Sequence, residues 1–332
     1  MGLKMPSRFW KRYFTALLLS ALSCALTPPN AHTQKPHRTR EFALVANSPE
    51  FWRLVAPETK LHTMGSGFGF TEGPVWDKRG FLWVSDEETN KIFRLYPDGH
   101  RDEAVSLGDP DGSTFDKANQ LIDCASVLRA IIRLSRDGTT YTVLADRYRD
   151  KRFNSPNDIV MGPDGAFYFT DPTLDLPKGQ LQETPYQGVY RLDSQGQVRL
   201  LTTDLAQPNG LAFSPDGNSF YVDDTAQKVI WVYRFNRDGT ISNGRIFGRE
   251  DTTEHDGVPD GMRVDVAGNL FVTGPRGIWV WSPEGVHLGT IELPEQPANL
   301  AWGGDAMRTL YITAGTSVYT LEMNTHGFIP YE

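Results

Sequence analysis

Hydrophobic and polar residues alternate along most of the chain. From Lys60 onward, short runs in which every second residue is apolar are separated by glycine turns such as Asp98-Gly99 and Asp238-Gly239. A period of two is typical of half-buried β-strands, and Asp-Gly is a strong turn signal between strands. After Lys60 no stretch of useful length shows the 3.6-residue period of an amphipathic helix. The pattern therefore predicts an all-β body.

Two repeating units lie within this body. The first is an apolar strand followed by a glycine turn, and its six copies begin at Ile92, Ile131, Val189, Val232, Ile278 and Val318. These starts are 39, 58, 43, 46 and 40 residues apart, close to the length of a four-stranded propeller blade. A second unit alternates with the first and also occurs six times. We therefore predict a six-bladed β-propeller domain over residues 59–332, with a ring closed by the strand near residues 60–64 against the last blade.

The second repeating unit carries the candidate chemistry. In a propeller the innermost strand of each blade lines the central channel, so equivalent residues of successive repeats converge. Five of the six residues that open this unit carry a carboxylate or a carboxamide; the six are Glu72, Ser113, Asn157, Asn209, Asp260 and Asn299. Burying such groups together is costly unless a partner satisfies them, and a cation with oxygen ligands does so.

We predict that Glu72, Asn157, Asn209 and Asp260 bind a divalent metal ion. Calcium is the expected ion because the set is all oxygen, with Zn²⁺ or Mg²⁺ as alternatives. Asn-Gly at 209 and Asp-Gly at 260 are also hairpin signals, so turns are the alternative interpretation of those two positions. Glu72 and Asn157 share the same place in the repeat without being hairpin dipeptides. Asn299 is interpreted as a structural hydrogen-bonding group.

The N-terminal part of the chain differs from the body. Residues 1–31 combine basic residues, an apolar stretch over 13–26 and a small-residue exit, which is typical of a cleaved export signal. Residues 32–58 are predicted as a tether with one short helix, which Ser48-Pro49-Glu50 would open. We therefore expect a periplasmic or secreted protein. Its one remaining cysteine, Cys124, leaves it without an internal disulfide.

Charge narrows the range of partners. The formal net charge is −8, and removal of residues 1–31, which hold four basic and no acidic residues, takes it to −12. No stripe rich in Lys or Arg occurs in the body. An acidic protein of this kind is a poor candidate for binding nucleic acid or, once the signal is cleaved, an anionic membrane. A small-molecule substrate fits better.

Several segments resemble the gluconolactonase, senescence-marker-protein-30 and luciferin-regenerating-enzyme family, with the form of its bacterial exported gluconolactonase branch. The segments are 71–76, 153–158, 208–211, 259–262, 303–305 and 309–315. Two positions depart from the family pattern. Ser155 stands where the animal branch has an arginine, and Ser126 stands where bacterial relatives often have a histidine.

The resemblance implies a six-bladed, metal-dependent hydrolase that opens a sugar lactone, such as D-glucono-1,5-lactone to gluconate. It also implies that Glu72, Asn209 and Asp260 bind the ion. By the same likeness Asn157 binds metal or substrate, and Asp260 is the catalytic acid or base. Two alternatives remain open. The same site could hydrolyse other lactones or phosphotriesters, or the propeller could be a non-catalytic binding module.

Overall fold

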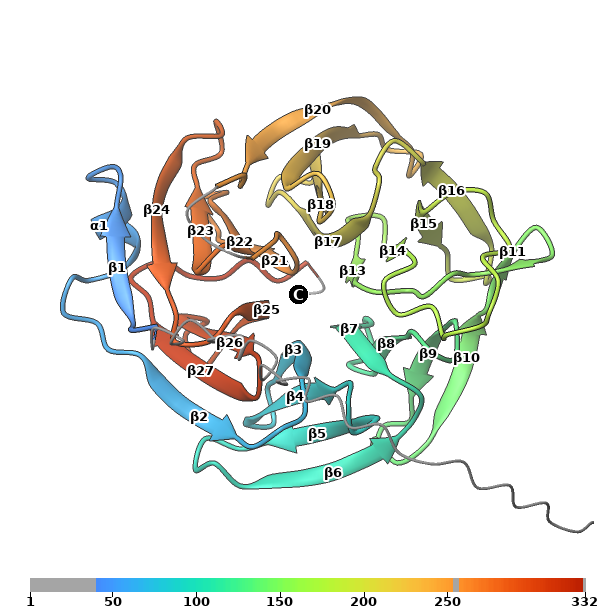
Figure 1. Cartoon of the computed structure of the whole chain (residues 1–332), viewed down its shortest axis with the longest axis horizontal. Helices are drawn as coiled ribbons and strands as arrows, with labels where there is room; N and C mark the ends of the chain where they lie inside the picture. The colour runs from blue at the N-terminus through green and yellow to red at the C-terminus, as the bar shows by residue number, and fades with distance from the viewer. Residues whose placement is uncertain (1–39, 253–256, 331–332) are drawn as a thin grey trace, which may run out of the picture. The chain divides into compact units, whose positions relative to one another are not determined.

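Six antiparallel sheets surround a central channel (Figure 1). The structure is a computed structural model that describes residues 40–252 and 257–330. Within them the body is almost entirely β, so the predicted fold class and the six blades are confirmed. No helix in the described residues combines the length and apolar character needed to cross a membrane. The export signal predicted at residues 1–31 lies outside the described residues.

The first three blades follow one another along the chain, each running from an inner to an outer strand. Their strands are β3 (Thr71–Asp77), β4 (Phe81–Asp86), β5 (Lys91–Leu95), β6 (Arg101–Ser106), β7 (Pro110–Phe115), β8 (Leu121–Ala125), β9 (Ala130–Leu134), β10 (Tyr141–Ala145), β13 (Ile159–Met161), β14 (Phe167–Asp171), β15 (Gly188–Leu192) and β16 (Val198–Thr202). A small hairpin, β11 (Arg147–Tyr148) and β12 (Lys151–Arg152), lies between the second and third blades in sequence.

The last three blades repeat this order, and two N-terminal strands join them. Their strands are β17 (Pro208–Phe213), β18 (Ser219–Asp224), β19 (Val229–Phe235), β20 (Ile241–Arg249), β21 (Met262–Val264), β22 (Leu270–Gly274), β23 (Gly277–Trp281), β24 (His287–Glu292), β25 (Pro297–Gly303), β26 (Thr309–Ala314) and β27 (Ser317–Glu322). Strand β2 (His62–Ser66) completes the sixth blade against β27. This confirms the predicted ring closure by the strand near residues 60–64.

Residues 40–58, the described part of the predicted tether, pack against the propeller. Strand β1 (Ala43–Ala46) pairs with β24 and gives the fifth blade a fifth strand, which the sequence analysis did not anticipate. The predicted short helix is present as α1 (Phe51–Leu54). Its residues Phe51 and Leu54 are buried between the fifth and sixth blades, so this segment packs as part of the propeller.

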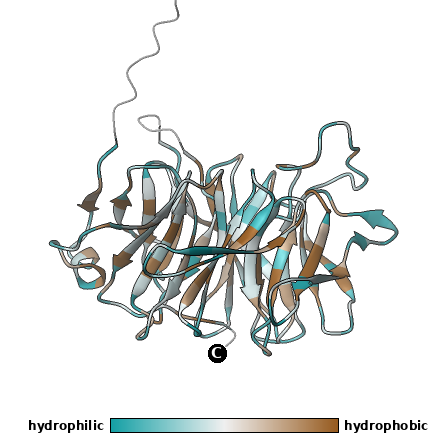
Figure 2. Ribbon diagram, turned by 90° about the horizontal axis from the view of Figure 1, so that it is seen from below, coloured by the Kyte–Doolittle hydropathy of each residue, from teal (hydrophilic) through white to brown (hydrophobic). Residues whose placement is uncertain are grey.

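Hydrophobic packing joins each blade to the next. The described residues contain six clusters of buried apolar side chains, one at each of the six interfaces between neighbouring blades. In Figure 2 the hydrophobic residues lie mostly in the strands. Each fully buried large side chain contributes about 1.5–3 kcal/mol. Cys124 is buried and unpaired in one of these clusters, as expected for a fold held by its core.

Irregular pairing marks the beginning of four inner strands. The register against the second strand of the blade shifts near the start of β3, β7, β17 and β25. A bulge bends a strand and changes the direction of its side chains, and bulges are common beside functional sites. These shifts all lie at one end of the channel, where the polar residues of the second repeat are found.

Candidate functional site

An acidic cavity of about 300 Å³ opens at the end of the channel where the inner strands begin. Glu72 and Asn209 are the second residues of β3 and β17, and Asn157 and Asp260 come two residues before β13 and β21. All four line this cavity, together with Phe70, Glu87, Glu88, Asp111, Leu174, Asp175, Thr225 and Val258. The structure therefore brings together the four residues predicted as a metal and substrate site.

The second blade contributes Asp111 to the cavity instead of Ser113. The Gly112 N–H donates to the Asn157 carbonyl (2.8 Å), just as the Gly261 N–H donates to Ala298 in the neighbouring blade (2.8 Å). Asp111 therefore occupies the place in its blade that Asp260 occupies in the fifth. Ser113 lies two residues further on, and its hydroxyl donates to Asp123 (2.8 Å). The predicted alignment of the repeat was wrong at Ser113.

The sixth blade shows a similar shift. Because Ala298 pairs with Gly261, Asn299 lies one residue beyond the cavity layer. Its side-chain nitrogen Nδ2 donates to Glu72 Oε2 (2.9 Å), and its Oδ1 accepts from the Leu300 N–H (2.9 Å). The interpretation of Asn299 as a structural hydrogen-bonding group agrees with these bonds, which hold a cavity carboxylate in place.

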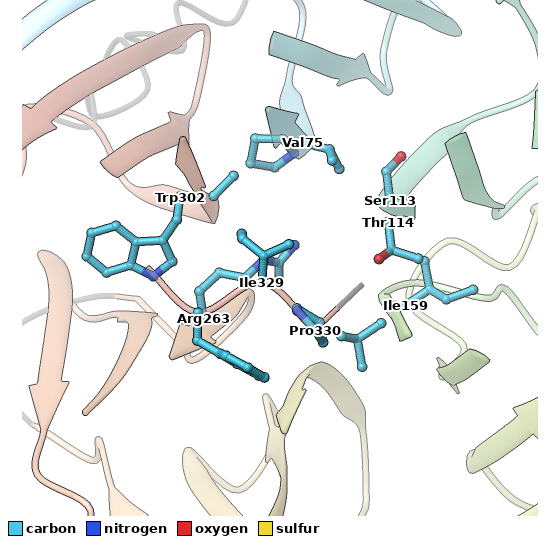
Figure 3. A pocket seen from close by; sticks show the side chains of 12 residues that line it. Val75, Ser113, Thr114, Ile159, Arg263, Trp302, Ile329 and Pro330 are labelled. Atoms are coloured by element: carbon cyan, nitrogen blue, oxygen red, sulfur yellow. The ribbon is translucent and has the colours of Figure 1, made fainter. Parts of the chain in front are cut away.

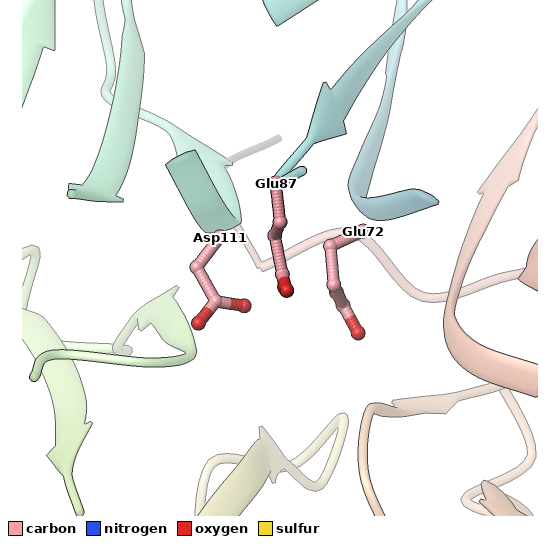
Figure 4. A group of neighbouring side chains, drawn as sticks. All are labelled: Glu72, Glu87 and Asp111. Atoms are coloured by element: carbon pink, nitrogen blue, oxygen red, sulfur yellow. The ribbon is translucent and has the colours of Figure 1, made fainter. Parts of the chain in front are cut away.

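Two further carboxylates reach the cavity from loops. Glu87 follows β4, and Asp175 lies in the loop after β14. Carboxylate oxygens of Glu72, Glu87 and Asp111 all lie within 4.8 Å of one another, and Figure 4 shows them projecting into one space. Glu87 and Asp175 were not predicted because they fall outside the repeating unit.

Hydrogen bonds fix which atoms face the cavity. Glu72 Oε2 accepts from the Gly73 N–H (2.7 Å) and from Asn299 Nδ2, which leaves Oε1 without a protein partner among the recorded bonds. Asn157 Nδ2 donates to Asp111 Oδ2 (2.7 Å), and Asn157 also hydrogen bonds to Asp175. Because Asn157 donates to the acidic wall through Nδ2, its Oδ1 can act as an acceptor.

The two departures from the family pattern lie directly behind these residues. The Ser126 hydroxyl donates to the Pro156 carbonyl (2.6 Å) and lies 3.1 Å from Asp111 Oδ2. Ser155 donates to the Pro172 carbonyl (2.9 Å) and accepts from the Asp175 N–H (3.2 Å). Both serines are buried, so they support the cavity wall without lining the cavity.

The carboxylates of the cavity repel one another. Burial raises the pKa of Glu72 to about 8. Burial and the charge of Glu72 raise the pKa of Asp260 well above its usual range, although a hydrogen bond from Asn209 opposes the shift. Burial and neighbouring carboxylates raise the pKa values of Glu87 and Asp111 in the same way. The site is therefore built to be neutralised by protons or by a cation.

The donor set fits a divalent cation. Glu72, Asn209 and Asp260 supply carboxylate and amide oxygens, the ligands that hard cations such as Ca²⁺ prefer. A buried group of unpaired carboxylates is stable only when its charge is compensated, and no basic side chain lines the cavity in the described residues. These residues could hold such an ion between the blades.

Among the described residues, the opposite end of the channel has few side chains that could take part in catalysis. A small cavity of about 30 Å³ there is lined mainly by apolar residues and by the C-terminal segment 328–330 (Figure 3). Its one charged side chain among the described residues is Arg263, which donates to the Met262 carbonyl (2.7 Å) and lies 3.7 Å from Asp158 Oδ2. Candidate catalytic groups are therefore confined to the acidic end.

The chain is similar in sequence to characterised lactonases. Residues 70–316 match the SMP-30/Gluconolactonase/LRE-like region. A gluconolactonase from Zymomonas mobilis is 34% identical over 306 residues, 84% of this chain and 86% of that protein. A 6-deoxy-6-sulfogluconolactonase from Pseudomonas putida is 31% identical over 253 residues, 73% of this chain and 82% of that protein.

A solved structure agrees with these sequence matches. The gluconolactonase from Xanthomonas campestris superposes with a TM-score of 0.78 at 30% identity, covering 87% of this chain and 99% of that one. The sequence match to the family over residues 70–316 runs through all six blades, from the start of β3 to the β26–β27 turn. The chain belongs to the SMP-30/gluconolactonase/LRE-like family.

Proposed function

We propose that this protein is a metal-dependent lactonase that opens a sugar lactone of the gluconolactone type. The observation that carries the proposal is the convergence of Glu72, Asn157, Asn209 and Asp260 on one buried acidic cavity. The similarity to a gluconolactonase over most of both chains supports the same reaction class. Calcium is the proposed ion because the available ligands are carboxylate and amide oxygens.

Different side chains of the cavity take part in separate steps of ester hydrolysis. When bound by Glu72, Asn209 and Asp260, a divalent cation supplies a Lewis acid that polarises the lactone carbonyl. Asp260 accepts a proton from the attacking water as the new carbon–oxygen bond forms. Asp260 then delivers that proton to the ring oxygen as the ring carbon–oxygen bond breaks, which gives the open hydroxy acid.

Substrate orientation falls to the amide of Asn157. Because its Nδ2 donates to Asp111, its Oδ1 is available to accept a hydrogen bond from a sugar hydroxyl. This arrangement would hold the lactone ring beside Asp260. Orientation of this kind lowers the barrier because the reacting groups are already placed for attack.

The test is hydrolysis of D-glucono-1,5-lactone followed by pH-stat, with the uncatalysed rate subtracted. We expect activity that a chelator removes and calcium restores, and that Asp260→Asn and Glu72→Gln abolish. Glu58→Gln, which changes an exposed carboxylate outside the cavity, is the matched control and should keep full activity. Full activity in the chelator, or in Asp260→Asn, would refute the proposed mechanism.

We also propose that the protein is exported and acts in the periplasm or outside the cell. The basic and apolar pattern of residues 1–31 supports this. Fractionation of cells that express the full chain, with N-terminal sequencing of the product, tests the idea. A protein that keeps Met1 and remains in the cytoplasm would contradict it.

A further inference from the structure

The acidic cavity has a strongly one-sided charge. Six of its twelve described lining residues carry carboxyl groups, and none is a lysine, arginine or histidine; the six are Glu72, Glu87, Glu88, Asp111, Asp175 and Asp260. The other lining groups are two amides, one hydroxyl and three apolar side chains.

A bound divalent ion would not reverse this charge. Burial raises the pKa values of the buried lining carboxyls, so protons or a bound ion offset much of the formal charge, but neither turns a lining side chain into a fixed positive group. The charge of Arg263 opposes the rise that burial causes in the pKa of Glu72, but Arg263 lines the cavity at the opposite end of the channel and is engaged by Met262 and Asp158. A negatively charged substituent away from the ion would therefore face carboxyl groups and no basic side chain among the described lining residues.

We propose that the cavity selects neutral lactones and rejects lactones that carry a further phosphate, sulfonate or carboxylate group. The inference rests on the proposed lactonase function and narrows its substrate class. Hydroxyl groups of a neutral sugar donate hydrogen bonds, and the cavity is rich in acceptors such as the Asn157 oxygen and the carboxylates. A binding site discriminates efficiently when it leaves the charge of an unwanted ligand without a partner or repels it.

The first test compares two lactones that differ only in one substituent. We expect kcat/KM for 6-phospho-D-glucono-1,5-lactone to be lower than for D-glucono-1,5-lactone by about tenfold or more, with a smaller gap at high salt. Equal or faster hydrolysis of the phosphorylated lactone, as in a protein adapted to an anionic sugar, would overturn the inference. Failure to hydrolyse either lactone would instead count against the lactonase function.

A binding measurement tests the preference for neutral ligands independently of catalysis. Isothermal titration calorimetry with D-glucitol and D-glucitol 6-phosphate compares a neutral polyol with its anionic counterpart. We expect the phosphate to bind more weakly, by about tenfold or more. Tighter binding of the phosphate would overturn the inference even if the protein proved to have no lactonase activity.

A charge reversal at the cavity mouth tests the cause. Glu88 lines the cavity with an exposed side chain, whereas Glu58 is exposed elsewhere. Glu88→Lys should raise the ratio of phosphorylated to neutral kcat/KM by about tenfold, and Glu58→Lys should leave it within about twofold. An unchanged ratio in Glu88→Lys, or an equal rise in both variants, would show that local charge does not set the preference.

Discussion

Replacing Glu72 with glutamine should make the ion-free protein more stable at pH 8 but less stable when calcium is present. Glutamine keeps the shape of the side chain, and its oxygen can accept the bonds from the Gly73 N–H and Asn299 Nδ2. It cannot ionise in the cavity. The variant therefore removes the cost of a buried charge together with one ligand of the proposed ion.

The magnitude follows from the pKa of Glu72. Burial raises this pKa from an ordinary 4.5 to about 8, so the folded chain favours the protonated carboxyl. The contribution of the protonated carboxyl to the free energy of unfolding is complete below pH 4.5 and is lost as the pH rises through 8. Ionisation reduces the free energy of unfolding by about 4 kcal/mol at pH 8 but only about 1 kcal/mol at pH 5. Glu72→Gln should recover most of that difference at pH 8.

Urea unfolding followed by tryptophan fluorescence measures the effect at both pH values, in a chelator and in calcium. In the chelator, we expect the free energy of unfolding of Glu72→Gln to exceed that of the wild type at pH 8 and to lie closer to it at pH 5. Calcium should stabilise the wild type, because it binds only the folded state, but should not stabilise Glu72→Gln. Glu58→Gln should follow the wild type throughout. A Glu72→Gln protein that is less stable than the wild type in the chelator at pH 8 would refute the reasoning.

Three further predictions concern the same cavity. Asp260→Asn should lower kcat for lactone hydrolysis by about 10²–10⁴-fold, because the proton acceptor is lost, while the far-UV circular dichroism spectrum stays unchanged. A near-normal kcat would exclude Asp260 as the base. Asn299→Ala should weaken calcium binding by about 10–100-fold in calorimetry, because Glu72 loses the amide that orients it; unchanged affinity would show that the Gly73 bond suffices. Calcium affinity should also fall about tenfold for each pH unit below 8, because Glu72 must release a proton to bind the ion; a flat profile from pH 6 to 8 would contradict this.

The architecture could be predicted because each blade repeats the same short-range pattern. Alternating strands and glycine turns are local signals, and six copies of each repeat fixed the number of blades. Strand β1 was missed for the opposite reason. Its four residues, Ala-Leu-Val-Ala, are a short apolar run without alternation, and they form a strand through pairing with β24, far away along the chain.

The site was predicted where it follows the repeat and missed where it does not. Asp111 could have been found, because Pro110-Asp111-Gly112 has the form of Pro259-Asp260-Gly261. The register shift in the second blade matches the shifts near Glu72 and Asn209, which agrees with that equivalence. Glu87 and Asp175 come from loops of unequal length, and no local pattern indicates where such loops end in space.

Three acidic residues at strand ends differ in their hydrogen bonds. Asp224 accepts bonds from the N–H groups of Ala206 (2.6 Å) and Gln227 (3.0 Å), and Asp171 accepts from the Asn154 N–H (2.9 Å). Both buried carboxylate oxygens of Asp223 lack a hydrogen-bond partner among the described residues, and burial and the charge of Asp260 raise the pKa of Asp223 well above its usual range. Burial of this kind depends on the packed blades and has no local sequence signal.

Closure of the ring by β2 also determines when the protein can finish folding. Strand β2 precedes the first blade in the chain, yet its partner β27 is the last strand of the sixth blade. Contacts of such long sequence separation form slowly, and until they form both strand edges stay unpaired. A nascent chain therefore cannot complete the circle until all six blades have been synthesised. That delay would keep the chain open for the interval in which the proposed export takes place.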